Sequence, residues 1–121
     1  MKLSSGVDLI DITRIRDVLE RHGDRFITRV FTEAEQRDCG GRISSLAARF
    51  AAKEAVSKAL GCGIGDVSWL DIEIKSDEKK APYLVLHRKG DRLAKELGLL
   101  NWSVSLSHTE SQAIAFVVAT G

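Results

Sequence analysis

The sequence predicts an α+β fold, in which a mainly antiparallel sheet packs against a long helix. The expected order of elements is β-α-α-α-β-β-α-β-β. Two pairs of successive strands are close enough in the chain to form hairpins, and hairpins give antiparallel pairing. The βαβ run that is typical of a dinucleotide-binding domain is not among these elements. We therefore expect helices on one face of an antiparallel sheet.

The composition is typical of one globular domain, residues 1–121. Hydrophobic residues make up 44% of the chain and charged residues 29%, while the net charge of +1 identifies no partner by itself. The two cysteines, Cys39 and Cys62, lack CxxC spacing, so neither zinc nor a disulfide framework is expected. Because no secretory signal and no apolar run of about 20 residues is present, we expect a cytoplasmic protein that does not enter a membrane.

The first strand is expected over residues 3–10, interrupted at Gly6. Thr13 is a suitable N-cap for a helix over 14–22, because its hydroxyl can accept a hydrogen bond from a free backbone N–H. Gly23 ends this helix or loosens its last turn. Helical spacing then places Arg14, Arg21 and Arg25 in a narrow stripe beside an apolar face of Ile15, Val18, Leu19, His22 and Phe26.

Thr32 and Glu35 begin a second, short helix with a capping box, and Gly40 and Gly41 end it. Periodicity and turn residues predict the other elements. These are a long helix over 43–60 closed by Gly61, a strand over 67–75, a turn at 77–80, a strand over 83–86, a helix over 88–97 ended by Gly98, and strands over 102–106 and 113–119 joined by 107–111.

The long helix carries Glu54 and Lys58, which are four residues apart and so share one face. An exposed ion pair, which stabilises a helix by about 0.3–0.5 kcal/mol, would account for these two residues. It would not account for Ala47, Ala51 and Ala55 around them. Such small side chains would allow a ligand to approach the helix backbone closely.

The loop that follows contains Gly61, Gly63 and Gly65. Glycines allow backbone N–H groups to approach a phosphate, or they simply cap a helix, and the Walker pattern is absent. Asp8 at the end of the first strand either caps the next helix or, together with Glu54, offers two hard oxygen ligands to Mg²⁺.

His108 and Thr109 lie at an expected hairpin tip, and Arg42, Arg49 and Lys53 lie on or near the long helix. Taken singly, each of these features is more typical of a structural or solvated residue. Taken together, two carboxylates, a lysine, a glycine loop, a histidine and arginines are the parts of a magnesium–pyrophosphate site.

Two segments, GVDLIDITRI (6–15) and RFAAKEAVSKALGCGIG (49–65), resemble holo-[acyl-carrier-protein] synthase, the small trimeric class of 4′-phosphopantetheinyl transferase. The family pattern is a Gly-x-Asp strand end followed by a Lys-Glu-Ala-x-x-Lys helix, and both parts are present. DIEI (71–74) and SLSHT (105–109) match family segments in the expected order. The resemblance runs from about residue 3 to residue 119 and implies the 4′-phosphopantetheinyl transferase fold.

The resemblance implies transfer of phosphopantetheine from coenzyme A to a serine of apo acyl carrier protein, with adenosine 3′,5′-bisphosphate as the other product. It implies a role in lipid (fatty acid) biosynthesis, a requirement for Mg²⁺ or Mn²⁺, and a homotrimer with coenzyme A in clefts between subunits. By resemblance, Asp8 and Glu54 hold the metal, and with Lys58 they form the catalytic group. The base that takes the serine proton is left open between a metal-bound water and Glu54.

The resemblance also implies two sets of binding residues. Basic residues of the first helix would meet the acidic recognition helix of the carrier protein; these are Arg14, Arg21 and Arg25, which could instead be ordinary surface residues paired with Asp17, Glu20 and Asp24. Contacts with coenzyme A would come from Arg42, Arg49, Lys58, Gly61, Gly63, Gly65, His108 and Thr109.

Three positions depart from the family pattern. Ser4 stands where the family often has a glycine, Cys62 stands where a loop threonine is common, and the usual Gly-Lys-Pro turn is Lys80-Ala81-Pro82. These departures put a backbone contact at Ser4, a hydroxyl in the loop and the type of the turn in question. None of them affects the expected metal ligands.

Two other functions are alternatives to an enzyme. A non-catalytic, trimeric nucleotide-binding module is disfavoured by the presence of Asp8, Glu54 and Lys58. A single-stranded RNA-binding domain is disfavoured because the four Phe, two Trp and one Tyr do not line up as a stacking platform.

Overall fold

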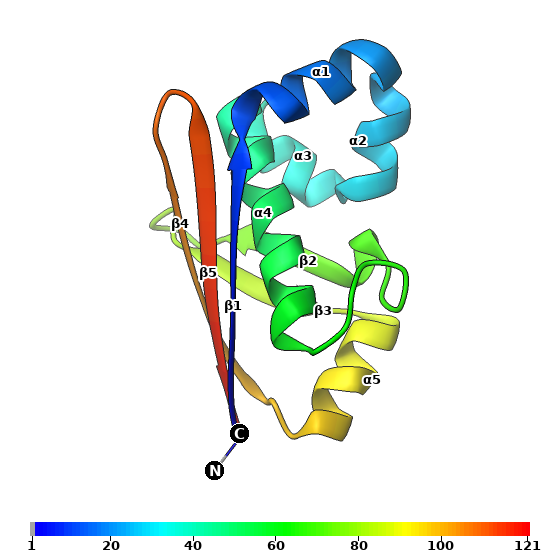
Figure 1. Ribbon diagram of the computed structural model, residues 1–121, viewed down its shortest axis with the longest axis vertical. Helices are drawn as coiled ribbons and strands as arrows, with labels where there is room; N and C mark the ends of the chain where they lie inside the picture. Colours follow the sequence, from blue (N-terminus) through cyan, green and yellow to red (C-terminus); the bar gives the residue numbers. More distant parts are fainter. Residues whose placement is uncertain (1) are drawn as a thin grey trace.

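The computed structural model describes residues 2–121 and confirms an α+β fold with antiparallel strands (Figure 1). The elements in chain order are β1 (Leu3–Asp11), α1 (Ile12–His22), α2 (Asp24–Val30), α3 (Glu33–Cys39), α4 (Ile43–Ala59), the 3₁₀ turn η1 (Trp69–Asp71), β2 (Ile72–Ser76), β3 (Pro82–Leu86), α5 (Arg88–Leu97), β4 (Asn101–His108) and β5 (Gln112–Thr120).

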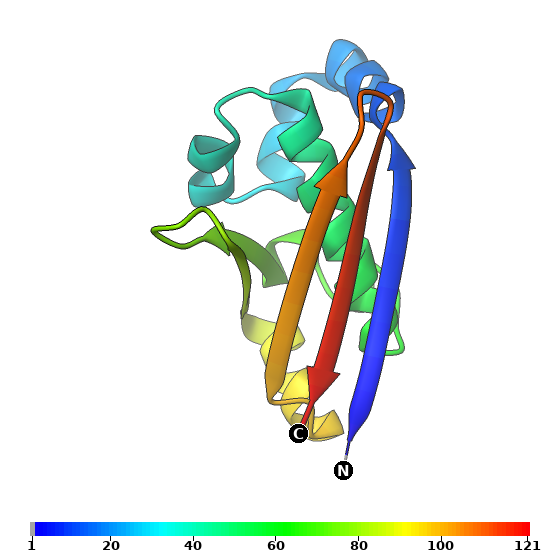
Figure 2. The ribbon, with the colours of Figure 1, turned by 90° about the vertical axis from the view of Figure 1, so that its left-hand side faces the viewer.

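The strands form two antiparallel sheets instead of one. The larger sheet has the order β1-β5-β4, and β2 pairs with β3 in a separate hairpin. In the larger sheet Asp8 lies opposite Ala115, and His108 lies opposite Ala113. Figure 2 shows the outward face of this sheet towards the viewer, with α4 behind it. Helices therefore cover one face of the larger sheet, as expected.

The predicted long helix is confirmed as α4, and its alanines pack against the sheet. Ala47, Ala51 and Ala55 are fully buried, as is Ala115 of β5. The expectation that these small residues leave room for a ligand was wrong, because β1 and β5 occupy that space. Their small volume instead lets the helix and the sheet approach each other closely.

The predicted first helix is confirmed as α1, which ends at His22 before Gly23, but a separate helix, α2, follows it and was not predicted. The helix α1 begins at Ile12, and its N-cap is Asp11 without a side-chain hydrogen bond, so Thr13 is not the cap. At Gly23 the backbone has a φ of 51°, and a new helix, α2, begins at Asp24. Arg25 therefore does not continue a stripe on the helix of Arg14 and Arg21. The predicted single helical stripe was wrong for this residue.

Local signals predicted several other boundaries correctly. Thr32 and Glu35 form both hydrogen bonds of the capping box, at 2.9 and 3.2 Å. Gly40 and Gly98 adopt the left-handed conformation that ends α3 and α5.

Two strand predictions differ from the structure. The first part of the strand expected over 67–75 is instead the turn η1. The strand β1 continues through Gly6 without interruption. Among residues 2–121, no helix has the length and apolarity needed to cross a membrane.

Candidate functional site

Gly6 and Ser4 hold β1 directly against α4. A Cβ atom at Gly6 would overlap the carbonyl oxygen of Ala55, so only glycine allows this approach. The Ser4 hydroxyl donates a hydrogen bond of 2.6 Å to the carbonyl oxygen of Ala59. At this position, where the family often has a glycine, the contact with α4 is therefore made by a side chain. These two contacts place Asp8, on the same face of the strand, beside the last turns of α4.

Lys58 bridges from α4 to this strand. Its Nζ donates to Asp8 Oδ1 at 3.0 Å and to the carbonyl oxygen of Val7 at 3.0 Å. The Lys58 side chain is 55% exposed, whereas the Asp8 side chain is only 13% exposed. The ammonium therefore covers a largely shielded carboxylate from the solvent side.

Glu54 lies one turn before Lys58 and has an unusual environment. Among the side chains of residues 2–121, its Oε1 is the one buried polar atom that lacks a hydrogen-bond partner. Burial raises the pKa of Glu54 above its ordinary value, and the Asp8 carboxylate raises it further, while Arg14 and Lys58 act in the opposite direction. An unpaired carboxylate oxygen beside a second carboxylate is the arrangement that a bound cation would stabilise.

The donor set fits magnesium. Among residues 2–121, no cluster of three or more His, Cys, Asp and Glu side chains is placed to hold a metal. Asp8 and Glu54 therefore offer carboxylate oxygens alone, from two residues. Mg²⁺ is commonly bound by one or two carboxylates, with water and substrate phosphates completing its octahedron. The structure thus brings together the three residues that were expected to form the catalytic group.

Arg14 contributes to this site in a way that sequence reasoning missed. Its guanidinium lies 5.5 Å from the ring centroid of Phe50 on α4, and it is close enough to Glu54 to lower the pKa of that carboxyl. Helical spacing placed Arg14 on a surface stripe but did not reveal that α1 crosses α4 at this point. Its charge opposes the repulsion between the two carboxylates.

Arg49 and Arg42 are held elsewhere within the same chain. The side chain of Arg49 is buried, and it donates to the carbonyl oxygen of Ile74 at 3.3 Å and to the hydroxyl of Ser76 at 2.8 Å. Arg42 donates to the backbone carbonyl of Asp38 at 2.8 Å. These arginines therefore lie near α3 and β2, and their contacts with coenzyme A stay predictions.

His108 and Thr109 lie at the tip of the hairpin between β4 and β5. His108 is exposed, and its Nδ1 lies 3.2 Å from the Thr109 carbonyl oxygen. The Thr109 hydroxyl accepts hydrogen bonds from the backbone N–H groups of Ser111 and Gln112. The tip is held against the junction of β1 and α1, where Ile12 donates to the Ser111 carbonyl at 2.8 Å. Figure 2 shows this tip beside the end of β1.

The glycine loop begins with a helix cap. Gly61 has a φ of 72° and donates to the Lys58 carbonyl at 2.9 Å, while Cys62 donates to the Ser57 carbonyl at 3.0 Å. This pair of bonds is a Schellman motif. Gly63 and Gly65 have open space at the Cβ position. The capping role of Gly61 is confirmed, and the approach of the loop to a nucleotide stays a prediction.

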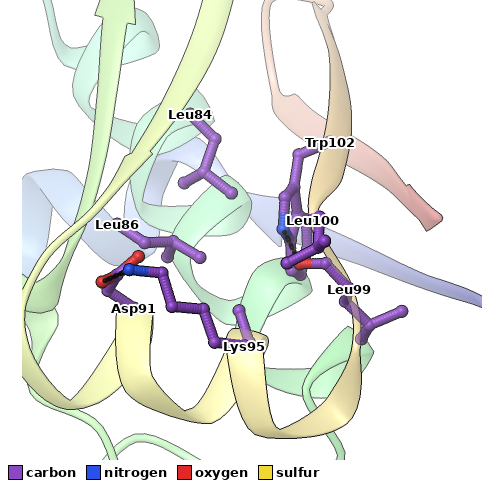
Figure 3. A pocket seen from close by; sticks show the side chains of 8 residues that line it. Leu84, Leu86, Asp91, Lys95, Leu99, Leu100 and Trp102 are labelled. Atoms are coloured by element: carbon purple, nitrogen blue, oxygen red, sulfur yellow. Dashed lines mark hydrogen bonds and ion pairs between the residues drawn. The ribbon is translucent and has the colours of Figure 1, made fainter. Parts of the chain in front are cut away.

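A separate hollow of about 190 Å³ lies between β3, α5 and β4 (Figure 3). Its lining includes Leu84, Leu86 and Trp102. Asp91 and Lys95 form a 2.9 Å ion pair at its edge. None of the residues expected in the functional site lines this hollow.

Comparison with known proteins places the chain in a family. Residues 4–117 match the model of the 4′-phosphopantetheinyl transferase superfamily. A holo-[acyl-carrier-protein] synthase of Herpetosiphon aurantiacus is 50% identical, over 98% of this chain and 99% of the relative. The chain belongs to the holo-[acyl-carrier-protein] synthase family of this superfamily. A synthase of Moorella thermoacetica is 48% identical over 93% of this chain and 90% of its own length.

Solved structures of the family have the same fold. The Helicobacter pylori holo-[acyl-carrier-protein] synthase in complex with coenzyme A matches with a TM-score of 0.88 and 36% identity, over 96% of this chain and 99% of that one. The Neisseria meningitidis synthase matches with a TM-score of 0.88 and 34% identity, over 98% of both chains. These findings confirm the resemblance, the fold and the prediction that the chain is a phosphopantetheinyl transferase enzyme.

Proposed function

We propose that the chain transfers 4′-phosphopantetheine from coenzyme A to a serine of apo acyl carrier protein, in a reaction that requires Mg²⁺ or Mn²⁺ and releases adenosine 3′,5′-bisphosphate. The observation that carries this proposal is the unpartnered Oε1 of Glu54 beside the Asp8 carboxylate. Relatives that share up to half of the sequence are named as holo-[acyl-carrier-protein] synthases, and one was solved in complex with coenzyme A.

Asp8 and Glu54 would hold the metal ion, which when bound neutralises negative charge on the pyrophosphate. Lys58 is exposed enough to turn from Asp8 towards a phosphate and to stabilise charge on the leaving bisphosphate as a point charge. A carboxylate that binds a metal has a low pKa and is a poor base. We therefore assign the removal of the serine proton to a water molecule in preference to Glu54.

Further contacts with coenzyme A are assigned to the residues expected from the family pattern. We propose that these are Arg42, Arg49, Gly61, Gly63, Gly65, His108 and Thr109. In the described chain, none of the side chains among them hydrogen-bonds to Asp8, Glu54 or Lys58. If the site is shared between subunits, some of these residues would meet Asp8, Glu54 and Lys58 of a neighbouring copy, so they need not contact them within one chain.

The outward face of the larger sheet supports a homotrimer. Val7 lies opposite Phe116, and Leu9 lies opposite Ile114, on the face that no helix covers (Figure 2). These four side chains and Leu3 are between 38% and 69% exposed. A contiguous apolar patch of this kind is typical of a protein–protein interface. We propose that three copies bury this face and form the coenzyme A clefts between them.

The carrier protein is proposed to dock on α1 and α2. Arg14, Arg21 and Arg25 are exposed on these neighbouring helices. Cationic side chains at such a surface would set the encounter rate and the orientation of an acidic partner helix. A role in fatty acid biosynthesis, a cytoplasmic location and a single domain over residues 1–121 stay predictions.

The proposal is tested by mass spectrometry of apo acyl carrier protein after incubation with the chain, coenzyme A and Mg²⁺. We expect the carrier to gain the mass of one phosphopantetheine, and we expect no gain when EDTA replaces the metal. Binding of coenzyme A without any gain in carrier mass would instead indicate a non-catalytic nucleotide-binding module.

A further inference from the structure

We propose that Lys58 acts as a latch on Asp8: in the metal-free protein its ammonium occupies the Asp8 carboxylate, and it must leave before a divalent cation binds there. This inference rests on the proposed metal site. It adds that the protein opposes metal binding until another group takes the ammonium. The diphosphate of coenzyme A has the charge to do so.

The contacts of the two carboxylates are unequal. Asp8 Oδ1 accepts a hydrogen bond of 3.0 Å from Lys58, whereas Glu54 Oε1 has no partner. One of the two expected ligands is therefore already occupied by a cation, and the other is free. A metal ion that took both carboxylates would lie within a few ångströms of the ammonium, and the two positive charges would repel each other.

Lys58 is placed to move without repacking the core. More than half of its side chain is exposed, and its two hydrogen bonds go to the surface of β1. By contrast, Lys53 on the same helix is fully buried and cannot turn outwards. Rotation of exposed side chains is fast, so the latch would open without a backbone change.

The charge balance of the site couples release of Lys58 to binding of metal and coenzyme A. In the metal-free site the charges of Asp8 and Glu54 are opposed by those of Lys58 and Arg14. A divalent cation would leave two positive charges in excess, and a diphosphate would balance them. The released ammonium could then bind the diphosphate. Metal and coenzyme A would therefore strengthen each other's binding, and by linkage this coupling is reciprocal.

The test is the affinity of the metal-free protein for Mn²⁺ in the absence of coenzyme A, measured by titration with electron paramagnetic resonance. We expect Lys58→Met to bind Mn²⁺ more tightly than the unaltered protein, by about fivefold or more. Lys58→Arg keeps the charge and should stay near the unaltered protein. Arg14→Met is the matched control, because Arg14 carries a charge near Glu54 but makes no hydrogen bond to Asp8 among the described contacts; its effect should be smaller.

A second readout is the coupling to coenzyme A. The ratio of the Mn²⁺ dissociation constants without and with coenzyme A should be larger in the unaltered protein than in Lys58→Met. Equal or weaker Mn²⁺ binding by Lys58→Met, or equal tightening by Arg14→Met, would overturn the latch and leave the metal site standing. If, in the presence of coenzyme A, the unaltered protein and Glu54→Gln bind Mn²⁺ equally, or folded unaltered protein binds none, the proposed metal site itself fails.

Discussion

Lys53 Nζ lies 2.8 Å from Glu35 Oε1, and both side chains are completely buried. Lys53 also donates to the carbonyl oxygens of Trp69 and Ile72, while Glu35 Oε2 accepts from the backbone N–H of Ile74. The pair therefore joins α3, α4, η1 and β2. Its position explains the lysine of the Lys-Glu-Ala motif as a structural residue, next to the glutamate of the site.

Lys53→Met should destabilise the protein strongly. Burial lowers the pKa of Lys53, with the Glu35 carboxylate opposing this shift, so the pair is costly to bury but more costly to break. Removing one partner leaves an uncompensated buried charge, and we expect a loss of about 3–5 kcal/mol in the free energy of unfolding. Urea denaturation would measure this loss. The control is Lys95→Met at an exposed lysine, where a change below about 0.5 kcal/mol is expected.

Gly6→Ala should separate β1 from α4 and displace Asp8. The added methyl group would overlap the Ala55 carbonyl oxygen, which belongs to the helix backbone and cannot turn away. We expect a loss of stability of about 3 kcal/mol and a loss of transfer activity. In Gly63→Ala, the methyl group meets no atom within 4 Å, so its unfolding free energy should stay close to that of the unaltered protein. Equal stability of Gly6→Ala and the unaltered protein would contradict this packing.

Glu54→Gln should stabilise the metal-free protein at neutral pH, by about 1 kcal/mol. Burial and the Asp8 carboxylate raise the pKa of Glu54 in the folded state above its unfolded value. Its contribution to stability is therefore fully present below the unfolded pKa and is lost as the pH rises through the folded pKa. The measurement is the melting temperature in EDTA at acidic and at neutral pH. The unaltered protein should lose stability between these two pH values, and Glu54→Gln should not show this loss. Mn²⁺ should raise the melting temperature of the unaltered protein only.

Arg21→Ala should raise the KM for carrier protein and leave the KM for coenzyme A unchanged. Arg21 is a cleaner test than Arg14, because Arg14 also acts on Glu54. An exposed ion pair contributes about 0.2–1 kcal/mol, so we expect an increase of roughly 1.4-fold to fivefold that shrinks with added salt. Arg92→Ala on α5 serves as the control. Equal changes in both KM values would remove Arg21 from the docking surface.

Local features of the sequence predicted most elements of the fold. The capping box at Thr32 and the glycines after α3, α4 and α5 act within a few residues, so they can be recognised without knowledge of the rest of the chain. The separate helix α2 was missed because seven residues after Gly23 continue the helical spacing of α1. The division into two sheets depends on packing between distant elements, which periodicity does not reveal.

The site was less predictable from the residues alone. Asp8 and Glu54 are far apart in the chain, and their proximity depends on the contact between Gly6 and the α4 backbone. Taken singly, spacing favoured a helix cap for Asp8 and a surface ion pair for Glu54; their pairing at a metal site was predicted from the combination of residues and from the family resemblance. The roles of Lys53 and Arg14 were missed because they depend on tertiary structure. Lys53 is buried in an ion pair, and Arg14 reaches Phe50 because α1 crosses α4 there.

The central claim is that a divalent cation binds between Asp8 and Glu54 and meets the diphosphate of coenzyme A. The most direct measurement is the position of Mn²⁺, located by anomalous scattering in crystals grown with the ion and coenzyme A. We predict one peak within about 2.3 Å of a carboxylate oxygen from each residue and of a diphosphate oxygen. Ordered coenzyme A with no peak between these carboxylates, or with the ion held by other residues, would contradict the account.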